Sequence, residues 1–261
     1  MRLVALDIDG TTVDHEGMLS PAVRAAVEDT VAAGLHVVIA TGRSVVATTE
    51  LLTELGLTSG YAVCSNGAVT IELDPAEPAG YRMVDVITFD PGPALRILRE
   101  QLPGVLVAVE ELGVGFLVNA PFPDGELSGE HRVVPWEELI RSPVTRVTLR
   151  DPDSSAEEFL EQAQHAGLHG VGYAVGWTAW LDLSPEGVSK ASALELLRRK
   201  LGVEPGDTVA VGDMRHDIEM LEWAARGVAM GNAPDEVKAV ADEVTGDVDD
   251  DGLVPVLRSL L

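Results

Sequence analysis

Two carboxylates stand at the end of a short apolar run near the start of the chain. Asp7 and Asp9 follow residues 3–6, and a Gly and two Thr come directly after them. In an extended chain, residues two apart point to the same side, so we expect both carboxylates to face one cavity. They repel each other, and a divalent cation is the simplest partner. An ordinary turn remains the alternative for this motif alone. An EF-hand loop is disfavoured, because its further acidic positions and closing Glu are missing.

Two other stretches have the residue types that bind an anion. Thr41-Gly42-Arg43 stands where an apolar run ends and a helical pattern begins, a place that offers a hydroxyl and free backbone N–H groups. A helix cap by Thr41 is the alternative. Lys190 follows Ser189, a predicted helix cap, and therefore lies in a first helical turn. A cation there opposes the helix dipole, so Lys190 either lies on the surface or points into a site as a fixed charge for phosphate.

A second pair of carboxylates follows the apolar run 208–211. Asp213 leaves the end of this predicted strand as Asp7 leaves the first one, and Asp217 lies one helical turn later. Acidic residues favour helix N-termini, which is the alternative explanation for Asp217. A carboxylate at the end of a buried strand does not stabilise the fold by itself, because burying a charge is unfavourable. Asp213 is therefore expected to take part in the site.

The elements that must position these stretches alternate between strand and helix. Strands are predicted at 3–6, 35–40, 61–64, 208–211 and 227–230, and helices at 20–33, 44–55, 189–201, 215–225, 234–241 and 250–260. Asn66-Gly67 predicts a hairpin whose returning strand is 69–71. This order is typical of an α/β fold with a Rossmann-like, doubly wound parallel sheet. Ligands bind such sheets at the carboxyl ends of the strands, where the four stretches lie.

The pattern changes to an α+β mixture between residues 84 and 185. Helices are predicted at 93–102 and 155–166, and strands at 105–109, 115–118, 144–150, 172–175 and 179–183. The chain is therefore predicted to have one core domain, residues 1–83 plus 186–261, interrupted by an inserted α+β domain of residues 84–185.

Composition excludes several classes of protein. The chain has 261 residues, 46% of them hydrophobic, which suffices for a sizeable core. A net charge of −25 disfavours nucleic acid and anionic membranes as partners. Cys64, the single cysteine, excludes an internal disulfide framework and fits a reducing compartment. The first apolar run breaks at Asp7, so no signal peptide is expected, and no run is long enough to span a membrane. A cytoplasmic protein is expected.

Together these motifs resemble the haloacid dehalogenase (HAD) superfamily of phosphohydrolases. The closer resemblance is to its Cof-type subfamily, whose C2-type (IIB) α/β cap is inserted between the second and third motifs. The matching stretches run nearly end to end: residues 7–11, 41–43, 65–68, Lys190, 212–217, 230–233 and 250–252.

The resemblance implies a Mg²⁺-dependent phosphatase acting on a small phosphorylated metabolite, such as a sugar phosphate or a phosphorylated cofactor. Asp7 would attack phosphorus and form an aspartyl-phosphate, and Asp9 would act as general acid and then as general base. Mg²⁺ would bind Asp7, the Asp9 backbone carbonyl and Asp213. The inserted domain would be a cap that selects the leaving group.

Further residues receive roles from the same resemblance. Thr41, with Gly42 beside it, and Lys190 would hold the phosphoryl oxygens, while Asp217 would orient Lys190 or metal-bound water. The candidates on the substrate side are Arg43, Asn66 and Asn232 in the core and Arg132, Arg146, Trp177 and Trp180 in the cap. For Asn232, a helix cap before Pro234 is the alternative.

One position departs from the family pattern. His216 stands where the family usually has Asn, directly before Asp217. Three alternatives are open for this residue. A neutral imidazole would replace the donor and the acceptor of the amide, and a protonated imidazole would add a positive charge. His216 could also only pack against its neighbours or face solvent.

Two other functions use related chemistry. A phosphotransferase or phosphosugar mutase would pass the phosphoryl group from the same phosphoenzyme to another hydroxyl. A phospho-acceptor signalling protein also uses Asp, Mg²⁺, Thr and Lys, but response-regulator receivers are shorter and have no cap. The expected assembly is a monomer or a weak homodimer.

Overall fold

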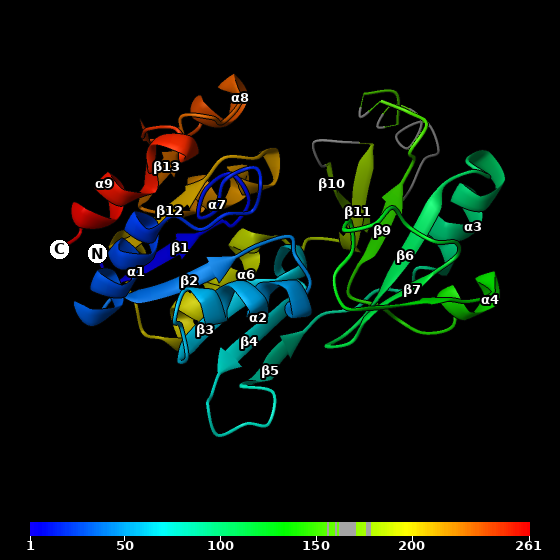
Figure 1. Ribbon diagram of the computed structural model, residues 1–261, viewed down its shortest axis with the longest axis horizontal. Coiled ribbons are helices and arrows are strands. Elements are labelled where there is room, and N and C mark those ends of the chain that lie inside the picture. Colours follow the sequence, from blue (N-terminus) through cyan, green and yellow to red (C-terminus); the bar gives the residue numbers. More distant parts are fainter. Residues whose placement is uncertain (156, 160, 162–170, 176–178) are drawn as a thin grey trace. The chain divides into compact units, whose positions relative to one another are not determined.

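The structure is a computed structural model of the chain (Figure 1). It describes residues 1–155, 157–159, 161, 171–175 and 179–261. The chain divides into two compact units, the first made of Met1–Gly42, Thr48–Asp85 and Ser189–Leu261 and the second of Arg43–Ala47 and Val86–Val188. Within the described ranges, no helix has both the length and the apolar character needed to cross a membrane.

An eight-stranded sheet forms the centre of the first unit. Its strands are β1 (Leu3–Leu6), β2 (His36–Ala40), β3 (Gly60–Cys64), β4 (Val69–Leu73), β5 (Tyr81–Val86), β12 (Thr208–Gly212), β13 (Arg226–Ala229) and β14 (Glu243–Val244). Their order is β14-β13-β12-β1-β2-β3-β4-β5. The pairings from β14 to β3 are all parallel, so these strands present their carboxyl ends at one edge.

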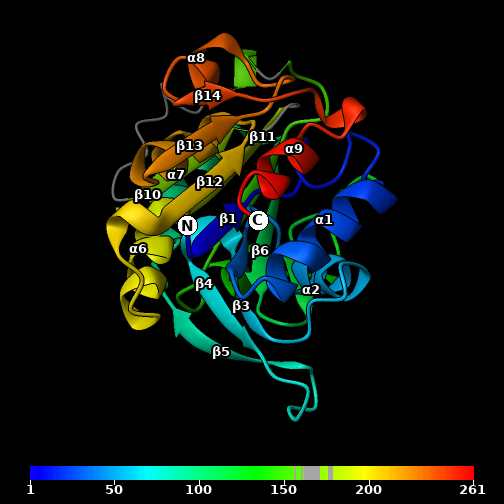
Figure 2. The ribbon, with the colours of Figure 1, turned by 90° about the vertical axis from the view of Figure 1, so that its left-hand side faces the viewer.

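Helices cover both faces of this sheet. They are α1 (Pro21–Ala32), α2 (Val45–Glu54), α6 (Lys190–Lys200), α7 (Ile218–Trp223), α8 (Asp235–Lys238) and α9 (Leu253–Arg258). Leu3 and Ala5 of β1 share a core with Leu194 of α6 and Leu221 of α7. In Figure 2, α1 and α6 lie on opposite sides of the strands. All four residues of β1 are fully buried, as expected for a parallel strand covered on both faces.

The doubly wound parallel sheet predicted from the sequence is confirmed, with local differences. The strand after β3 returns antiparallel as predicted, and Cys64 pairs with Val69, as the predicted bounds imply; the connection contains a short 3₁₀ turn, Ser65–Gly67, that was not predicted. The predicted helix 215–225 is a 3₁₀ turn, Arg215–Asp217, followed by α7. The predicted helix 234–241 is only the short α8, and the sequence did not predict β5 or β14.

The second unit is an α+β arrangement around a six-stranded sheet. Its elements are α3 (Gly92–Gln101), α4 (Trp136–Leu139), β6 (Leu106–Glu111), β7 (Gly115–Val118), β8 (Glu130–Val133), β9 (Val147–Arg150), β10 (Val171–Val175) and β11 (Trp180–Pro185). The strand order is β10-β11-β9-β6-β7-β8. Leu95 and Leu98 of α3 pack on Val107 and Leu149 of the sheet. Of the predicted elements, helix 155–166 lies mostly outside the described residues.

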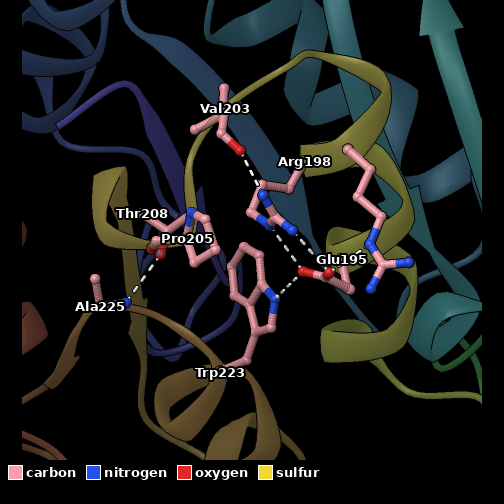
Figure 3. Close-up of polar contacts among 8 residues, drawn as sticks. Glu195, Arg198, Val203, Pro205, Thr208, Trp223 and Ala225 are labelled. Carbon is pink, nitrogen blue, oxygen red and sulfur yellow. Dashed lines mark hydrogen bonds and ion pairs between the residues drawn. The ribbon is translucent and has the colours of Figure 1, made fainter.

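A polar network around Glu195 joins α6 to α7 (Figure 3). The Glu195 carboxylate accepts hydrogen bonds from Arg198 Nε and Nη2, both at 2.8 Å, from Arg199 Nε at 2.7 Å and from Trp223 Nε1 at 3.0 Å. The hydrogen bonds from Arg198 and Trp223 hold the pKa of Glu195 well below its ordinary value. The network therefore fixes the two helices that begin beside the acidic strand ends.

We expect Glu195→Ala to lower the free energy of unfolding by about 1–2 kcal/mol near pH 7, because an indole N–H and two guanidinium groups lose their acceptor. A carboxylate with a lowered pKa stabilises the fold above its unfolded pKa of 4.5, and this stabilisation is lost as the pH falls through the folded pKa. The loss caused by the substitution should therefore shrink on acidification. Urea unfolding near pH 7 and near pH 3 measures both effects.

The matched control is Glu50→Ala, which removes an exposed glutamate of α2. It should change the free energy of unfolding by less than about 0.5 kcal/mol. Equal losses in the two variants, or a Glu195 effect that grows on acidification, would contradict the role given to this network.

Candidate active site

Asp7 stands directly at the carboxyl end of the central strand β1. Its backbone N–H donates to the Val211 carbonyl at 3.0 Å, and its own carbonyl accepts the Thr12 hydroxyl at 2.5 Å. The side chain is only 3% exposed. The backbone of Asp7 is thus held by two hydrogen bonds at the end of β1, which pairs with β2 on one side and β12 on the other.

Lys190 supplies a buried positive charge to this carboxylate. Its Nζ donates to Asp7 Oδ1 and to Asp217 Oδ1, each at 2.6 Å, and its side chain is 1% exposed. Ser189 caps α6 by accepting the Ser192 N–H, which places Lys190 at the first helical position. Burial alone would lower the pKa of Lys190, but the Asp217 and Asp7 carboxylates raise it above its ordinary value, so the side chain stays charged. The surface alternative for Lys190 is wrong.

Asp217 holds both Lys190 and the turn that follows β12. Its second oxygen, Oδ2, accepts the backbone N–H groups of Asp213 at 3.1 Å and Met214 at 2.9 Å. Burial alone would raise the pKa of Asp217, but Lys190 and these hydrogen bonds lower it below its ordinary value. A Cβ at Gly212 would lie 2.6 Å from Asp217 Cγ, so glycine is required where the turn passes this carboxylate.

The Asp213 carboxylate contacts the turn that follows Asp9. The Thr11 hydroxyl donates to Asp213 Oδ1 at 2.8 Å. Gly10 has a φ of +79°, and a Cβ there would lie 2.4 Å from Asp213 Oδ2. Glycine therefore serves both the backbone conformation and the close approach. Thr11 was not among the predicted site residues, although its place directly after the Asp-x-Asp-Gly motif indicates such a role.

Asn232 braces the same turn rather than capping a helix. Its Nδ2 donates to the Gly10 carbonyl at 2.8 Å and lies 3.4 Å from Asp213 Oδ2, while its Oδ1 accepts the Val248 N–H at 3.0 Å. The residue before α8 is Pro234, and no side chain caps that helix. The helix-cap alternative for Asn232 is therefore wrong, and its contact with substrate stays a prediction.

The carboxylates outnumber the cation that they face. Burial raises the pKa of Asp213 to about 7, with the charge of Asp217 adding to the shift. Burial also raises the pKa of Asp7 well above its ordinary value. The negative charges of Asp217, Asp213 and Asp9 raise this pKa further, and the positive charge of Lys190 lowers it. This excess negative charge fits a bound cation, and carboxylate and carbonyl oxygens are the ligands that a hard divalent ion prefers.

A second group of ligand atoms lies beside the first. One atom each of Asp7, His216 and Asp217 lies within 4.8 Å of the others, a spacing that a metal ion can bridge. Lys190 already pairs with both carboxylates, and the other oxygen of Asp217 accepts two backbone N–H groups. The cation of this group is therefore Lys190. Burial lowers the pKa of His216 to about 4, and Lys190 adds to the shift, so the imidazole is neutral at neutral pH.

Thr41 lies at the end of β2, beside the turn after β3. Its N–H donates to the Val63 carbonyl at 2.8 Å, and its carbonyl accepts the Asn66 N–H at 3.0 Å. The Ser44 hydroxyl accepts the Ala47 N–H of α2 at 3.4 Å, and the role of Thr41 stays a prediction. The first unit thus brings Thr41, Gly42 and Asn66 together.

The remaining candidates belong to the second unit or lie outside the described residues. Arg43 is part of the second unit, and its role stays a prediction. In the six-stranded sheet, Arg146 is buried and pairs with Asp182 at 3.5 Å, and Trp180 Nε1 donates to the same residue at 3.2 Å. Arg132 is exposed and pairs with Glu138. Trp177 lies outside the described residues.

Comparisons of the chain with known proteins all indicate the same family. A family model described as haloacid dehalogenase-like hydrolase matches residues 4–81 and 125–257. The chain is 30% identical over 286 residues to pyridoxal phosphate phosphatase YbhA of Escherichia coli (strain K12), covering 100% of this chain and 98% of that protein. It is 26% identical over 271 residues to 5-amino-6-(5-phospho-D-ribitylamino)uracil phosphatase YcsE of Bacillus subtilis (strain 168), covering 99% and 95%.

The likeness extends to solved structures. A structure described as the HAD subclass IIB sugar phosphatase BT4131 matches with a TM-score of 0.82 and 26% identity, covering 100% of this chain and 99% of the other. The family match includes both acidic strand ends and Lys190, so the resemblance carried by the motifs is confirmed. The chain is an enzyme and belongs to the haloacid dehalogenase-like hydrolases.

Proposed function

We propose that this enzyme is a Mg²⁺-dependent phosphatase that hydrolyses a small phosphorylated metabolite through an aspartyl-phosphate on Asp7. The observation that carries the proposal is the buried Lys190 ammonium, 2.6 Å from Asp7 Oδ1 and from Asp217 Oδ1. A fixed positive charge beside a carboxylate nucleophile lowers the barrier to phosphoryl transfer, because it is in place before charge develops. Two relatives named as phosphatases of phosphorylated small molecules support the substrate class.

The reaction has two steps, each assisted by Asp9. In the first, an Asp7 oxygen attacks phosphorus, the P–O ester bond breaks, and protonated Asp9 gives its proton to the leaving oxygen. In the second, the Asp9 carboxylate takes a proton from water, whose oxygen attacks phosphorus. The P–O bond to Asp7 breaks, and inorganic phosphate leaves. Asp9 is exposed while Asp7 is buried, which suits a group that exchanges protons with substrate and water.

The other residues hold the reacting groups. Lys190 and Thr41 bind the phosphoryl oxygens, and Asp217 orients Lys190. Asp7, the Asp9 backbone carbonyl and Asp213 would hold Mg²⁺, which supplies positive charge between nucleophile and phosphoryl group when bound. Residues 84–185 form a cap that selects the leaving group and 1–83 plus 186–261 form the catalytic core. Cys64, the single cysteine of the chain, is buried and cannot form an internal disulfide, which supports a cytoplasmic enzyme.

We expect Asp7→Asn to reduce phosphate release by at least about 1,000-fold, because an amide is a poor nucleophile toward phosphorus. A chelator should abolish release by the native enzyme. Both effects are measured as inorganic phosphate released from a panel of phosphorylated metabolites. Full turnover by Asp7→Asn would exclude the nucleophile assignment, and isomer formation without free phosphate would favour a mutase.

We expect Lys190→Gln to lower the free energy of unfolding by about 3 kcal/mol, because two buried carboxylates lose their counter-charge. Phosphate release should fall by at least about 100-fold. The matched control is Lys200→Gln at the other end of α6, an exposed lysine that lies 4.0 Å from Glu72 and over the Tyr61 ring, and whose loss should cost at most about 1 kcal/mol. Urea unfolding and phosphate release measure the two effects, and equal behaviour of the variants would exclude the role of Lys190.

Asp213→Asn is expected to change stability in opposite directions without and with metal. A carboxyl whose pKa is raised from 3.8 to about 7 makes the metal-free fold less stable as the pH rises through that window. In chelator near pH 7, the substitution should therefore raise the melting temperature. Adding Mg²⁺ should stabilise the native protein and leave the variant unchanged. Equal Mg²⁺ shifts in both proteins would exclude Asp213 as a ligand.

A further inference from the structure

The turn after β3 has an unusual backbone. Ser65 and Asn66, two adjacent non-glycine residues, have φ values of 50° and 54°, and Gly67 follows with a φ of 102°. Each such left-handed residue costs roughly 1–2 kcal/mol, and less for Asn than for most others. A conformation of this kind persists only where the surrounding structure imposes it.

Two neighbours impose this conformation. The Asn66 N–H donates to the Thr41 carbonyl at 3.0 Å. A Cβ on Gly67 would lie 2.2 Å from the Ser189 carbonyl oxygen and 3.2 Å from the Lys190 backbone nitrogen. The turn therefore packs between Thr41 and the start of α6. In the proposed function, Thr41 and Lys190, the first residue of α6, bind the phosphoryl oxygens.

The Asn66 carboxamide lies across Gly42. A Cβ on Gly42 would be 3.0 Å from Asn66 Oδ1 and 3.3 Å from Nδ2. Asn66 is only 8% exposed, and within the described residues its buried Oδ1 accepts no hydrogen bond. Burying an acceptor without a donor is unfavourable, so a strained turn that holds one in place indicates that a donor arrives with a ligand.

We propose that Asn66 determines specificity for the leaving group: its Oδ1 accepts a hydrogen bond from a hydroxyl on the carbon skeleton of the substrate. The preferred substrates are therefore hydroxylated phosphomonoesters. This rests on the proposed function, which takes Thr41 and Lys190 as the phosphoryl ligands. Because Oδ1 is an acceptor, the group that it meets must be a hydrogen-bond donor. This excludes the oxygens of a carboxylate or of a phosphoryl dianion, which only accept. A hydroxyl near the ester oxygen is the donor that a neutral skeleton offers.

The test compares phosphate esters that differ by one hydroxyl. The pairs are 2-hydroxyethyl phosphate with ethyl phosphate and 3-hydroxypropyl phosphate with propyl phosphate. For each pair, the ratio of the two kcat/KM values is measured in the native enzyme and in Asn66→Gly. Glycine adopts the required φ freely, so this variant removes the carboxamide without adding backbone strain. Comparing ratios between enzymes cancels the different intrinsic reactivity of the esters.

We expect the native enzyme to favour the hydroxylated member of at least one pair, and Asn66→Gly to reduce that ratio by about 5- to 100-fold. Asn66→Asp keeps the acceptor oxygen and tolerates the same φ, so the ratio should stay within about threefold of native even though added charge slows both reactions. Ser65→Gly relieves the backbone while keeping the carboxamide, and should also keep the ratio. An unchanged ratio in Asn66→Gly, or an equal loss in Asn66→Asp, overturns the proposal.

Failure of this inference is distinguishable from failure of the proposed function. If phosphate release needs Asp7 and Mg²⁺ but the ratio is the same in native enzyme and Asn66→Gly, only the role of Asn66 is overturned. If no ester releases phosphate, calorimetric Kd values for the same pairs decide. Tighter binding of the hydroxylated ester by the native protein, lost in Asn66→Gly, supports the role, and equal binding overturns it.

Discussion

One buried ammonium makes this arrangement of carboxylates possible. Asp7 follows β1 and Asp217 ends the turn after β12, and each would be costly to bury as an anion without a partner. Lys190 pairs with both, and its own position depends on the cap that starts α6 and on the network that ties α6 to α7. Asp7 and Asp213 keep negative charge that Lys190 does not neutralise, and this charge favours the binding of a cation. Structure and chemistry therefore depend on the same charge balance.

Much of this was predictable from the sequence, because parallel strands bring their carboxyl ends to one edge. The apolar runs that became β1 and β12, each followed by a carboxylate, sufficed to predict that Asp7 and Asp213 lie close together. The alternation of strands and helices predicted the doubly wound order. For Lys190, 183 residues from Asp7 in the chain, the residues left two interpretations open, an exposed surface or a fixed charge in the site, and only the tertiary contacts distinguish them.

The rest depended on tertiary contacts that local sequence does not encode. Asn66-Gly67 predicts the hairpin, but the local sequence does not show that Gly67 lies where the turn meets Ser189. β14 is a pair of exposed residues that forms only because β13 offers an edge. Asn232 has the residue type of a helix cap and instead braces Gly10, a contact across 222 residues.

The central position of β1 also constrains the order of assembly during synthesis. Its Val4 pairs with Val37 on one side and with Val209 on the other, so one edge of β1 stays open until the chain is four-fifths made. An open apolar edge is where nascent chains pair wrongly, whereas the strands of the second unit are contiguous in sequence and can fold while the first unit waits. Lys190, Asp213 and Asp217 all emerge after that insert. Asp7 therefore leaves the ribosome long before its counter-charge, and catalytic competence arrives only with the last part of the chain.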